Sequence, residues 1–192
     1  MAAMDAAERK LMARVAAGDE DAFAGLYDAY AGRIYRYALV RTGRRDLAEE
    51  AVQETLLAAW RGASSWRGES ALSTWLFGIC HRCLGHLLRK LEPPPLGPAP
   101  AVGAQADQRD GVHECGDDPW PNQDRSLTLR RALAAMDEGL RETLFLVYYL
   151  DLSVTEAAQV MAVPVGTVKS RLHTARRRLA AMLQDGGAEH AH

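Results

Sequence analysis

The chain has few cysteines, no long apolar run and almost no proline outside one segment, and each scarcity excludes a class of protein. Three cysteines in 192 residues are too few for the disulfide framework of a small secreted domain, which fits a reducing compartment. No apolar run is long enough to span a membrane, and the N-terminus lacks the apolar core of a signal peptide. We therefore expect a globular protein of the cytoplasm.

Strand signals are also missing, because no alternating apolar runs are separated by turns at hairpin spacing. Helical periodicity takes their place on both sides of the chain's centre. One apolar stripe is formed by Leu47, Ala51, Leu56 and Ala59, and another by Leu72, Leu76, Ile79, Cys83 and Leu87. The sequence predicts an all-α fold.

Proline is concentrated in one place, since seven of the eight prolines fall between positions 93 and 123. Proline breaks helices, so this stretch predicts a flexible linker over residues 93–124. It would separate two small helical domains, residues 1–92 and 125–184, and residues 185–192 would form a tail.

Charge is distributed unevenly although the formal net charge is only −2. Residues 1–92 hold 13 basic and 12 acidic residues, and residues 93–124 hold one arginine against six acids. Residues 125–184 hold nine basic residues against five acids. This asymmetry predicts a polyanionic partner for the C-terminal domain alone.

The C-terminal domain carries the pattern of a helix-turn-helix. Ser153 and Glu156 form a capping box that opens a short helix, and Pro164 interrupts the pattern before a second helix starts near Gly166. In such a motif the second helix enters the DNA major groove.

The second helix has one apolar and one basic side. Val168, Leu172, Ala175 and Leu179 share the side expected to be buried, and Lys169, His173 and Arg176 lie opposite. Basic side chains neutralise phosphates and read base edges, although a charged face is most often merely solvated. Capping box, turn and two-sided helix together favour DNA binding.

Four stretches resemble the extracytoplasmic-function (ECF) sigma factors of bacteria. LSVTEAAQVMAVPVGTVKSRLHTARRRL is similar to their region 4. GDEDAFAGLYDAYAGRIYRYA, DLAEEAVQETLLAAWRG and WRGESALSTWLFGICHRCLGHLLRK are similar to region 2, in order and spacing. The resemblance implies an alternative sigma factor that binds core RNA polymerase and directs promoter-specific transcription initiation. It implies no enzymatic activity and no cofactor.

Region 4 of the family recognises the −35 promoter element with the second helix. The resemblance carries this role to Gly166, Thr167, Lys169, Ser170, Arg171, His173, Thr174, Arg176 and Arg177. Gly166 and Thr167 would let backbone N–H groups approach a phosphate. The family often has arginine where this chain has Thr174, which puts one contact in doubt.

Region 2 of the family recognises and melts the −10 element, and a base that leaves the stack needs a pocket. The resemblance places this task on the loop with Trp66, Arg67, Glu69 and Ser70. On the next helix, the spacing of Arg82, His86 and Arg89 puts them on one face that could follow the backbone of the −10 strand, and the alternative is an ordinary solvated basic end. Helical spacing indicates that Trp60 and Trp75 are core residues and leaves Trp66 open.

The polymerase-binding helix of region 2 docks on the clamp helices of the β′ subunit, and the β flap is a further expected contact. The corresponding residues are Asp46, Glu49, Glu50, Gln53, Glu54 and Leu57. Family members are often held by an anti-sigma factor between the two domains, so an anti-sigma factor is expected as a partner.

Cysteine and histidine spacing raises a competing interpretation, since Cys80, Cys83 and His86 could join His113 and Cys115 around a metal. Structural zinc prefers its cysteine pair in a tight turn, whereas this pair lies within a predicted helix, so we expect thiols without a metal. Two rival functions remain, a free-standing repressor and a redox- or zinc-sensing interaction protein.

Overall fold

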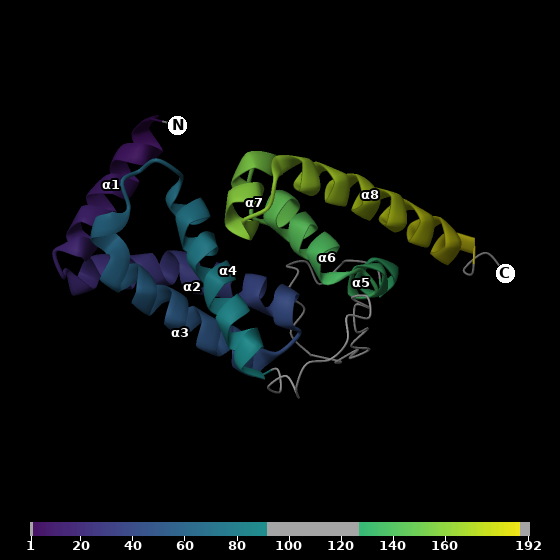
Figure 1. The fold of residues 1–192 in the computed structure, drawn as a ribbon, viewed down its shortest axis with the longest axis horizontal. Helices are drawn as coiled ribbons and strands as arrows, with labels where there is room; N and C mark the ends of the chain where they lie inside the picture. The colour runs from purple at the N-terminus through teal and green to yellow at the C-terminus, as the bar shows by residue number, and fades with distance from the viewer. Residues whose placement is uncertain (1, 92–126, 189–192) are drawn as a thin grey trace, which may run out of the picture.

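The computed structural model describes residues 2–91 and 127–188. Every regular element in this part of the chain is helical, which confirms the all-α prediction (Figure 1). The predicted linker, residues 93–124, lies outside the described residues, as does the end of the predicted tail.

The N-terminal half consists of four long helices and one short turn. They are α1 (Ala2–Ala16), α2 (Glu20–Thr42), α3 (Arg45–Gly62), a 3-10 turn (Ala63–Ser65) and α4 (Leu72–Leu91). Gly18, with φ of 83°, ends α1, and the Asp19 carboxylate then accepts the Ala22 N–H at 3.0 Å and so caps α2. Gly43 closes α2 in the left-handed conformation, with φ of 63°.

The C-terminal half contains shorter helices and one long one. They are α5 (Leu127–Ala134), α6 (Glu138–Leu144), a π-helical segment (Phe145–Tyr149), α7 (Val154–Met161) and α8 (Val165–Ala188). The π-helical segment follows α6 directly, without a break between them. α8 continues four residues into the stretch that the sequence assigned to the tail.

The helix-turn-helix forms as its pattern predicted. The Ser153 hydroxyl accepts the Glu156 N–H at 3.2 Å, and the Glu156 carboxylate accepts the Ser153 N–H at 2.8 Å. Ala162 ends α7 with φ of 52°, and α8 begins at Val165. The turn therefore sits between a doubly capped helix and the long basic one.

The two halves pack against each other through α4 with α7 and α2 with α6 (Figure 1). One hydrophobic cluster spans the boundary, with Phe77 and Leu84 from the N-terminal half and Phe145 and Met161 from the C-terminal half. A second cluster belongs to the N-terminal half alone, between α1, α2, α3 and α4. The two halves are separate along the sequence, but they share one of the two hydrophobic clusters.

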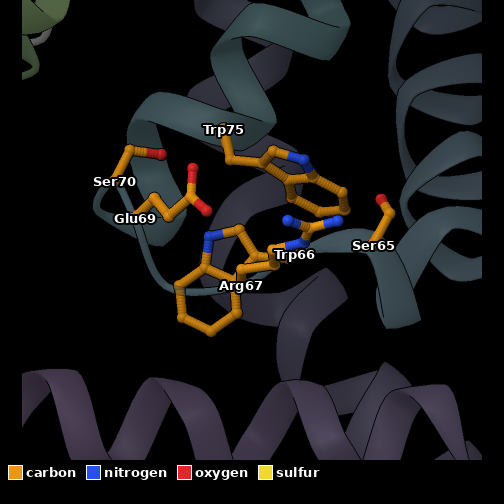
Figure 2. Close-up of a pocket in the computed structure, with 6 residues that line it drawn as sticks. All are labelled: Ser65, Trp66, Arg67, Glu69, Ser70 and Trp75. Atoms are coloured by element: carbon orange, nitrogen blue, oxygen red, sulfur yellow. The ribbon is translucent and has the colours of Figure 1, made fainter.

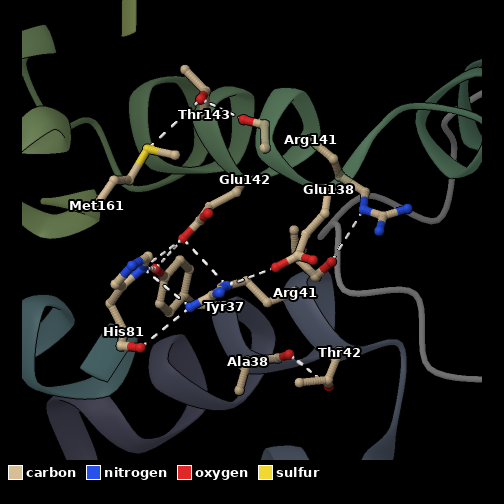
Figure 3. A network of polar contacts seen from close by, with 12 residues as sticks. Tyr37, Ala38, Arg41, Thr42, His81, Glu138, Arg141, Glu142, Thr143 and Met161 are labelled. Atoms are coloured by element: carbon tan, nitrogen blue, oxygen red, sulfur yellow. Dashed lines mark hydrogen bonds and ion pairs between the residues drawn. The ribbon is translucent and has the colours of Figure 1, made fainter. Parts of the chain in front are cut away.

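A buried carboxylate lies in this shared core. Glu142 of α6 is only 3% exposed, and Figure 3 shows Tyr37, Arg41 and His81 pointing toward it. The Tyr37 hydroxyl donates to its Oε1 atom, and Nδ1 of His81 lies 3.0 Å from the same oxygen. Arg41 lies 3.5 Å from Glu142 and donates to Glu138 at 3.1 Å.

These partners decide the charge state of Glu142. Burial raises the pKa of its carboxyl, but the hydrogen bond from His81 and the charge of Arg41 lower it. The hydrogen bond from the Tyr37 hydroxyl lowers it further, so the pKa of Glu142 lies below the ordinary value of a glutamate. Glu142 is therefore ionised in the packed form, and partners from α2 and α4 of the other half compensate its charge.

Further polar contacts join the halves around this cluster. Arg36 donates to the Tyr149 hydroxyl at 2.5 Å and lies over its ring, and Arg141 donates to the Val40 carbonyl at 3.1 Å. At the other end of the boundary, Thr74 of α4 donates to the capping-box residue Glu156 at 3.2 Å.

Replacing Glu142 with glutamine tests the charged contact. We expect Glu142→Gln to lower the free energy of unfolding by about 1–3 kcal/mol at pH 7, because the hydrogen bonds weaken and Arg41 loses its buried counter-charge. The depressed pKa makes this contribution largest above about pH 4.5, near the unfolded value of a glutamate, and it is lost as the pH falls through the folded pKa. Urea unfolding of both proteins between pH 3 and 7 measures the difference.

Glu20→Gln is the matched control, since Glu20 is an exposed glutamate of α2. It should change the free energy of unfolding little at any pH. A difference between wild type and Glu142→Gln that stays constant from pH 3 to 7 would contradict the assigned charge state.

Candidate nucleic-acid interface

α8 buries the side that the sequence assigned to the core. Val168, Leu172 and Ala175 are each at most 5% exposed, and they pack against α5, α6 and α7. The predicted DNA-contacting residues that are exposed on the remaining surface are Gly166, Lys169, Ser170, His173, Thr174, Arg176 and Arg177. The buried side thus fixes the helix so that a basic surface faces outward.

Two arginines of this helix have neighbours that the sequence did not reveal. Arg171 is half-buried and lies over Gly139 of α6. A Cβ added at Gly139 would lie 3.2 Å from the guanidinium carbon of Arg171. Arg176 donates to the Tyr148 hydroxyl, with Nε at 2.6 Å, and lies 5.5 Å from the ring centroid. Arg171 therefore faces α6 rather than joining the exposed set, and Arg176 is held beside the π-helical segment.

A pocket of about 270 Å³ opens in the loop between α3 and α4. Four of its lining residues, Trp66, Arg67, Glu69 and Ser70, are those predicted for the −10 element, and Ser65 and Trp75 complete it. Glu69 and Ser70 flank one side and Ser65 the other, with Trp66, Arg67 and Trp75 between them (Figure 2). The predicted residues are thus brought together in a hollow that combines indole rings with both signs of charge.

The three tryptophans near the pocket differ in how deeply they are buried. Trp66, which the sequence left open, is only 9% exposed in the core with Met12 and Leu72, and its Nε1–H has no hydrogen-bond partner among the described residues. Trp75, expected in the core, is half-buried and also lines the pocket. Trp60 packs edge-on against Phe23, with ring centroids 4.8 Å apart.

α4 presents its predicted basic residues away from the core. Arg82, His86 and Arg89 are all exposed to solvent. Their spacing of four and three residues places them on one side of the helix, where a phosphate backbone could run. The opposite side of α4 carries Leu76, Cys80 and Leu84, which are buried.

α3 exposes an acidic surface with an apolar end. Its exposed residues include Asp46, Glu49, Glu50, Gln53, Glu54 and Leu57, and Leu57 is 42% accessible although it is a large apolar residue. Asp46 is paired with Arg44, whose hydrogen bond lowers the pKa of that carboxyl. α2 and α4 make the contacts with α6 and α7, so the acidic surface stays accessible in the packed form (Figure 1).

Burial governs the thiols of the two α4 cysteines. Burial raises the pKa of Cys80 to about 12, and it also raises the pKa of the half-buried Cys83. Over residues 2–91 and 127–188 no group of three or more histidine, cysteine or acidic side chains is placed to hold a metal ion. The other two residues of the competing metal interpretation, His113 and Cys115, lie outside the described residues.

Membrane-spanning character is also absent from the part of the chain that the structure describes. None of the helices there combines the length and the apolar composition that crossing a bilayer requires.

Comparison with known protein families gives two matches, one for each half. The family described as Sigma-70 region 2 matches residues 26–92, and the family described as Sigma-70, region 4, matches residues 126–179. The first match covers α3, the pocket loop and α4, and the second covers α5 to α7 and α8 as far as residue 179.

Curated relatives match across nearly the full chain. SigM of Mycobacterium tuberculosis, an ECF RNA polymerase sigma factor, is 30% identical over 92% of this chain and 84% of its own length. SigW of Bacillus subtilis, another ECF sigma factor, is 29% identical over 92% of this chain and 97% of its length. The RNA polymerase sigma-H factor of Pseudomonas aeruginosa is 30% identical over 92% of this chain and 94% of its own length.

Two solved structures share the fold. CnrH, in complex with the cytosolic domain of CnrY, gives a TM-score of 0.60 at 23% identity and covers 93% of this chain and 98% of its own. The sigma factor RpoE of Bartonella quintana, in complex with the anti-sigma factor NepR, gives a TM-score of 0.59 at 24% identity. It covers 84% of this chain and 96% of its own.

Thiol alkylation tests the environment of Cys80. With a pKa near 12 instead of about 8.5, its thiolate population at pH 8 is lower on the order of a thousandfold. In a Cys83→Ala, Cys115→Ala background we therefore expect iodoacetamide to modify the folded protein far more slowly than the urea-unfolded protein, as followed by mass spectrometry. Equal rates in the two states would show that Cys80 is accessible and reactive.

Proposed function

This chain belongs to the extracytoplasmic-function (ECF) family of RNA polymerase sigma factors and directs transcription initiation, and we propose that its two halves divide that task. Residues 1–92 bind core RNA polymerase and recognise and melt the −10 element. Residues 125–184 read the −35 element. The observation that carries this proposal is that three surfaces of the required chemistry, on α3, in the pocket loop and on α8, are exposed at once.

The −35 contact is supported by α8, which buries one side in the core and exposes the other. Lys169, His173 and Arg177 are exposed on a helix whose other side is fixed in the core, and neutralised phosphates give affinity while side chains read base edges. Gly166 and Thr167 lie in the first turn of α8, where the positive end of the helix dipole attracts a phosphate, while the Thr167 N–H itself donates to the Pro164 carbonyl at 2.9 Å. Arg171 contributes by packing over Gly139 as much as by any DNA contact.

The −10 contact is supported by the pocket. A flipped base requires a stacking surface and polar groups at its edge, and Trp75 with Arg67 and Glu69 offers both. The basic side of α4, with Arg82, His86 and Arg89, would follow the backbone of the same strand.

The polymerase contact is supported by the surface of α3. Acidic residues around an exposed leucine suit a protein interface that is polar at its rim and apolar at its centre. Because Arg44 already pairs with Asp46, we expect Glu50 and Glu54 to supply most of the uncompensated charge for the β′ clamp helices. The β flap is the further polymerase contact that we propose.

The remaining assignments follow from this role. The chain itself is proposed to be non-catalytic, because nucleotide addition belongs to the polymerase, and to act in the cytoplasm where the polymerase works. The solved structures of CnrH and of the Bartonella sigma factor hold regulatory partners, CnrY and NepR. An anti-sigma factor is accordingly the inhibitory partner that we propose for this chain.

Transcription on fragmented genomic DNA by purified core RNA polymerase tests the function directly. With the protein present we expect discrete 5′ ends that are absent without it, and the aligned upstream sequences give both promoter elements. Binding to core without discrete starts would contradict the proposal that the two halves read the promoter elements. Tight binding to duplex DNA without any binding to core would favour the rival interpretation, a free-standing repressor.

Salt dependence tests the basic surface of α8. We expect Lys169→Ala and Arg177→Ala each to weaken promoter binding by the reconstituted holoenzyme and to reduce the slope of log K against log salt concentration by about 1, because each removes one phosphate contact. Arg131→Ala, an exposed arginine of α5 outside the helix-turn-helix, should leave the slope unchanged. Fluorescence anisotropy at several salt concentrations measures it, and an unchanged slope in both helix variants would remove α8 from the DNA interface.

A further inference from the structure

The first helix, α1, contacts the pocket loop although it precedes the part of the chain matched by Sigma-70 region 2, residues 26–92. At the start of the loop, Met12 and Val15 of α1 are at most 2% exposed and share a cluster with Ala63 of the 3-10 turn. Trp66 belongs to the same cluster, so this lining residue of the pocket shares the core that α1 helps to form.

In the middle of the loop, α1 supports a glycine. Gly68 has φ of 71°, which few other residues adopt, and it lies between the lining residues Arg67 and Glu69. A Cβ at this position would lie 3.1 Å from Nε of Arg9. The Arg9 side chain therefore passes directly beside the backbone that carries the pocket's two charged residues.

At the end of the loop, α1 supplies a hydrogen bond. The carboxylate of Glu8 accepts the backbone N–H of Leu72 at 3.2 Å. Leu72 is the first residue of α4, so its N–H has no partner within the helix, and a negative charge there also suits the helix dipole. Glu8 thus fixes the point where the loop becomes α4, two residues after Ser70.

From these three contacts we propose that α1 is a working part of the −10 reader, with Glu8 as a positioning residue for the pocket loop. This inference rests on the proposed role of that loop. Residues 66–71 have no helix of their own to hold them, so contacts from outside fix their conformation. A loop that is ordered before DNA arrives does not lose that freedom on binding, and the affinity for the flipped base rises accordingly.

The test uses holoenzyme reconstituted from core polymerase and the full chain. Its probe is a fluorescent single-stranded oligonucleotide that carries the −10 sequence found by transcription mapping. We expect Glu8→Ala to weaken oligonucleotide binding about five- to tenfold, as the loss of a hydrogen bond to a charged acceptor implies. Glu8→Gln retains an acceptor oxygen and should restore part of that affinity.

Three measurements separate positioning from folding. Affinity for core polymerase and affinity for a duplex with only the −35 element should stay near wild type in both Glu8 variants, and the thermal midpoint should fall by no more than a few degrees. Glu20→Gln, which removes a charge just beyond α1, should change neither these three quantities nor oligonucleotide binding. If Glu8→Ala lowers core and −35 binding as much as −10 binding, the residue is merely structural and the inference fails.

Arg67→Ala separates this inference from the function on which it rests. If Arg67→Ala weakens oligonucleotide binding and Glu8→Ala does not, the pocket reads DNA without help from α1, and only the inference is overturned. If neither variant changes oligonucleotide binding, the loop does not read the −10 element and the proposed function of the pocket fails with it.

Discussion

The carboxylate of Glu142 imposes the strongest constraint on the structure. An ionised group that is 3% exposed is costly unless charged and hydrogen-bonding partners surround it, and here Tyr37, Arg41 and His81 all come from the other half of the chain. Apolar burial alone could tolerate several packings of α2 and α4 against α6 and α7. The carboxylate tolerates far fewer, because most shifts would leave a charge without its partner.

This packing leaves the functional surfaces on separate elements of a single frame. The acidic surface of α3, the pocket between α3 and α4 and the basic surface of α8 all remain open to solvent, while their opposite sides form the two cores. Unlike charges are thus kept apart, so that the acidic surface does not neutralise the basic one. A polymerase surface and a DNA backbone can each meet the sign of charge that suits it.

Sequence reasoning found the features that depend on local pattern. The capping box at Ser153, the turn before Pro164 and the buried side of α8 depend on residues a few positions apart, and all were predicted. Contacts between distant segments were missed, such as Tyr148 beside Arg176 and Glu8 at the start of α4, because no local spacing encodes them. One available signal was Glu142 itself, an acid between the buried residues Leu140 and Leu144, which marks a carboxylate in need of distant partners.

The π-helical segment has a consequence for insertions and deletions. Two neighbouring tyrosines of this segment have different partners, Arg36 of the N-terminal half for Tyr149 and Arg176 of α8 for Tyr148. A π-helical turn holds one residue more than an α-helical turn, so removing one residue would let the segment tighten into an ordinary α-helix and would move at least one of the two tyrosines from its present position. The two tyrosines could then no longer hold both neighbours, so this stretch should tolerate changes of side chain more readily than a change of length by a single residue.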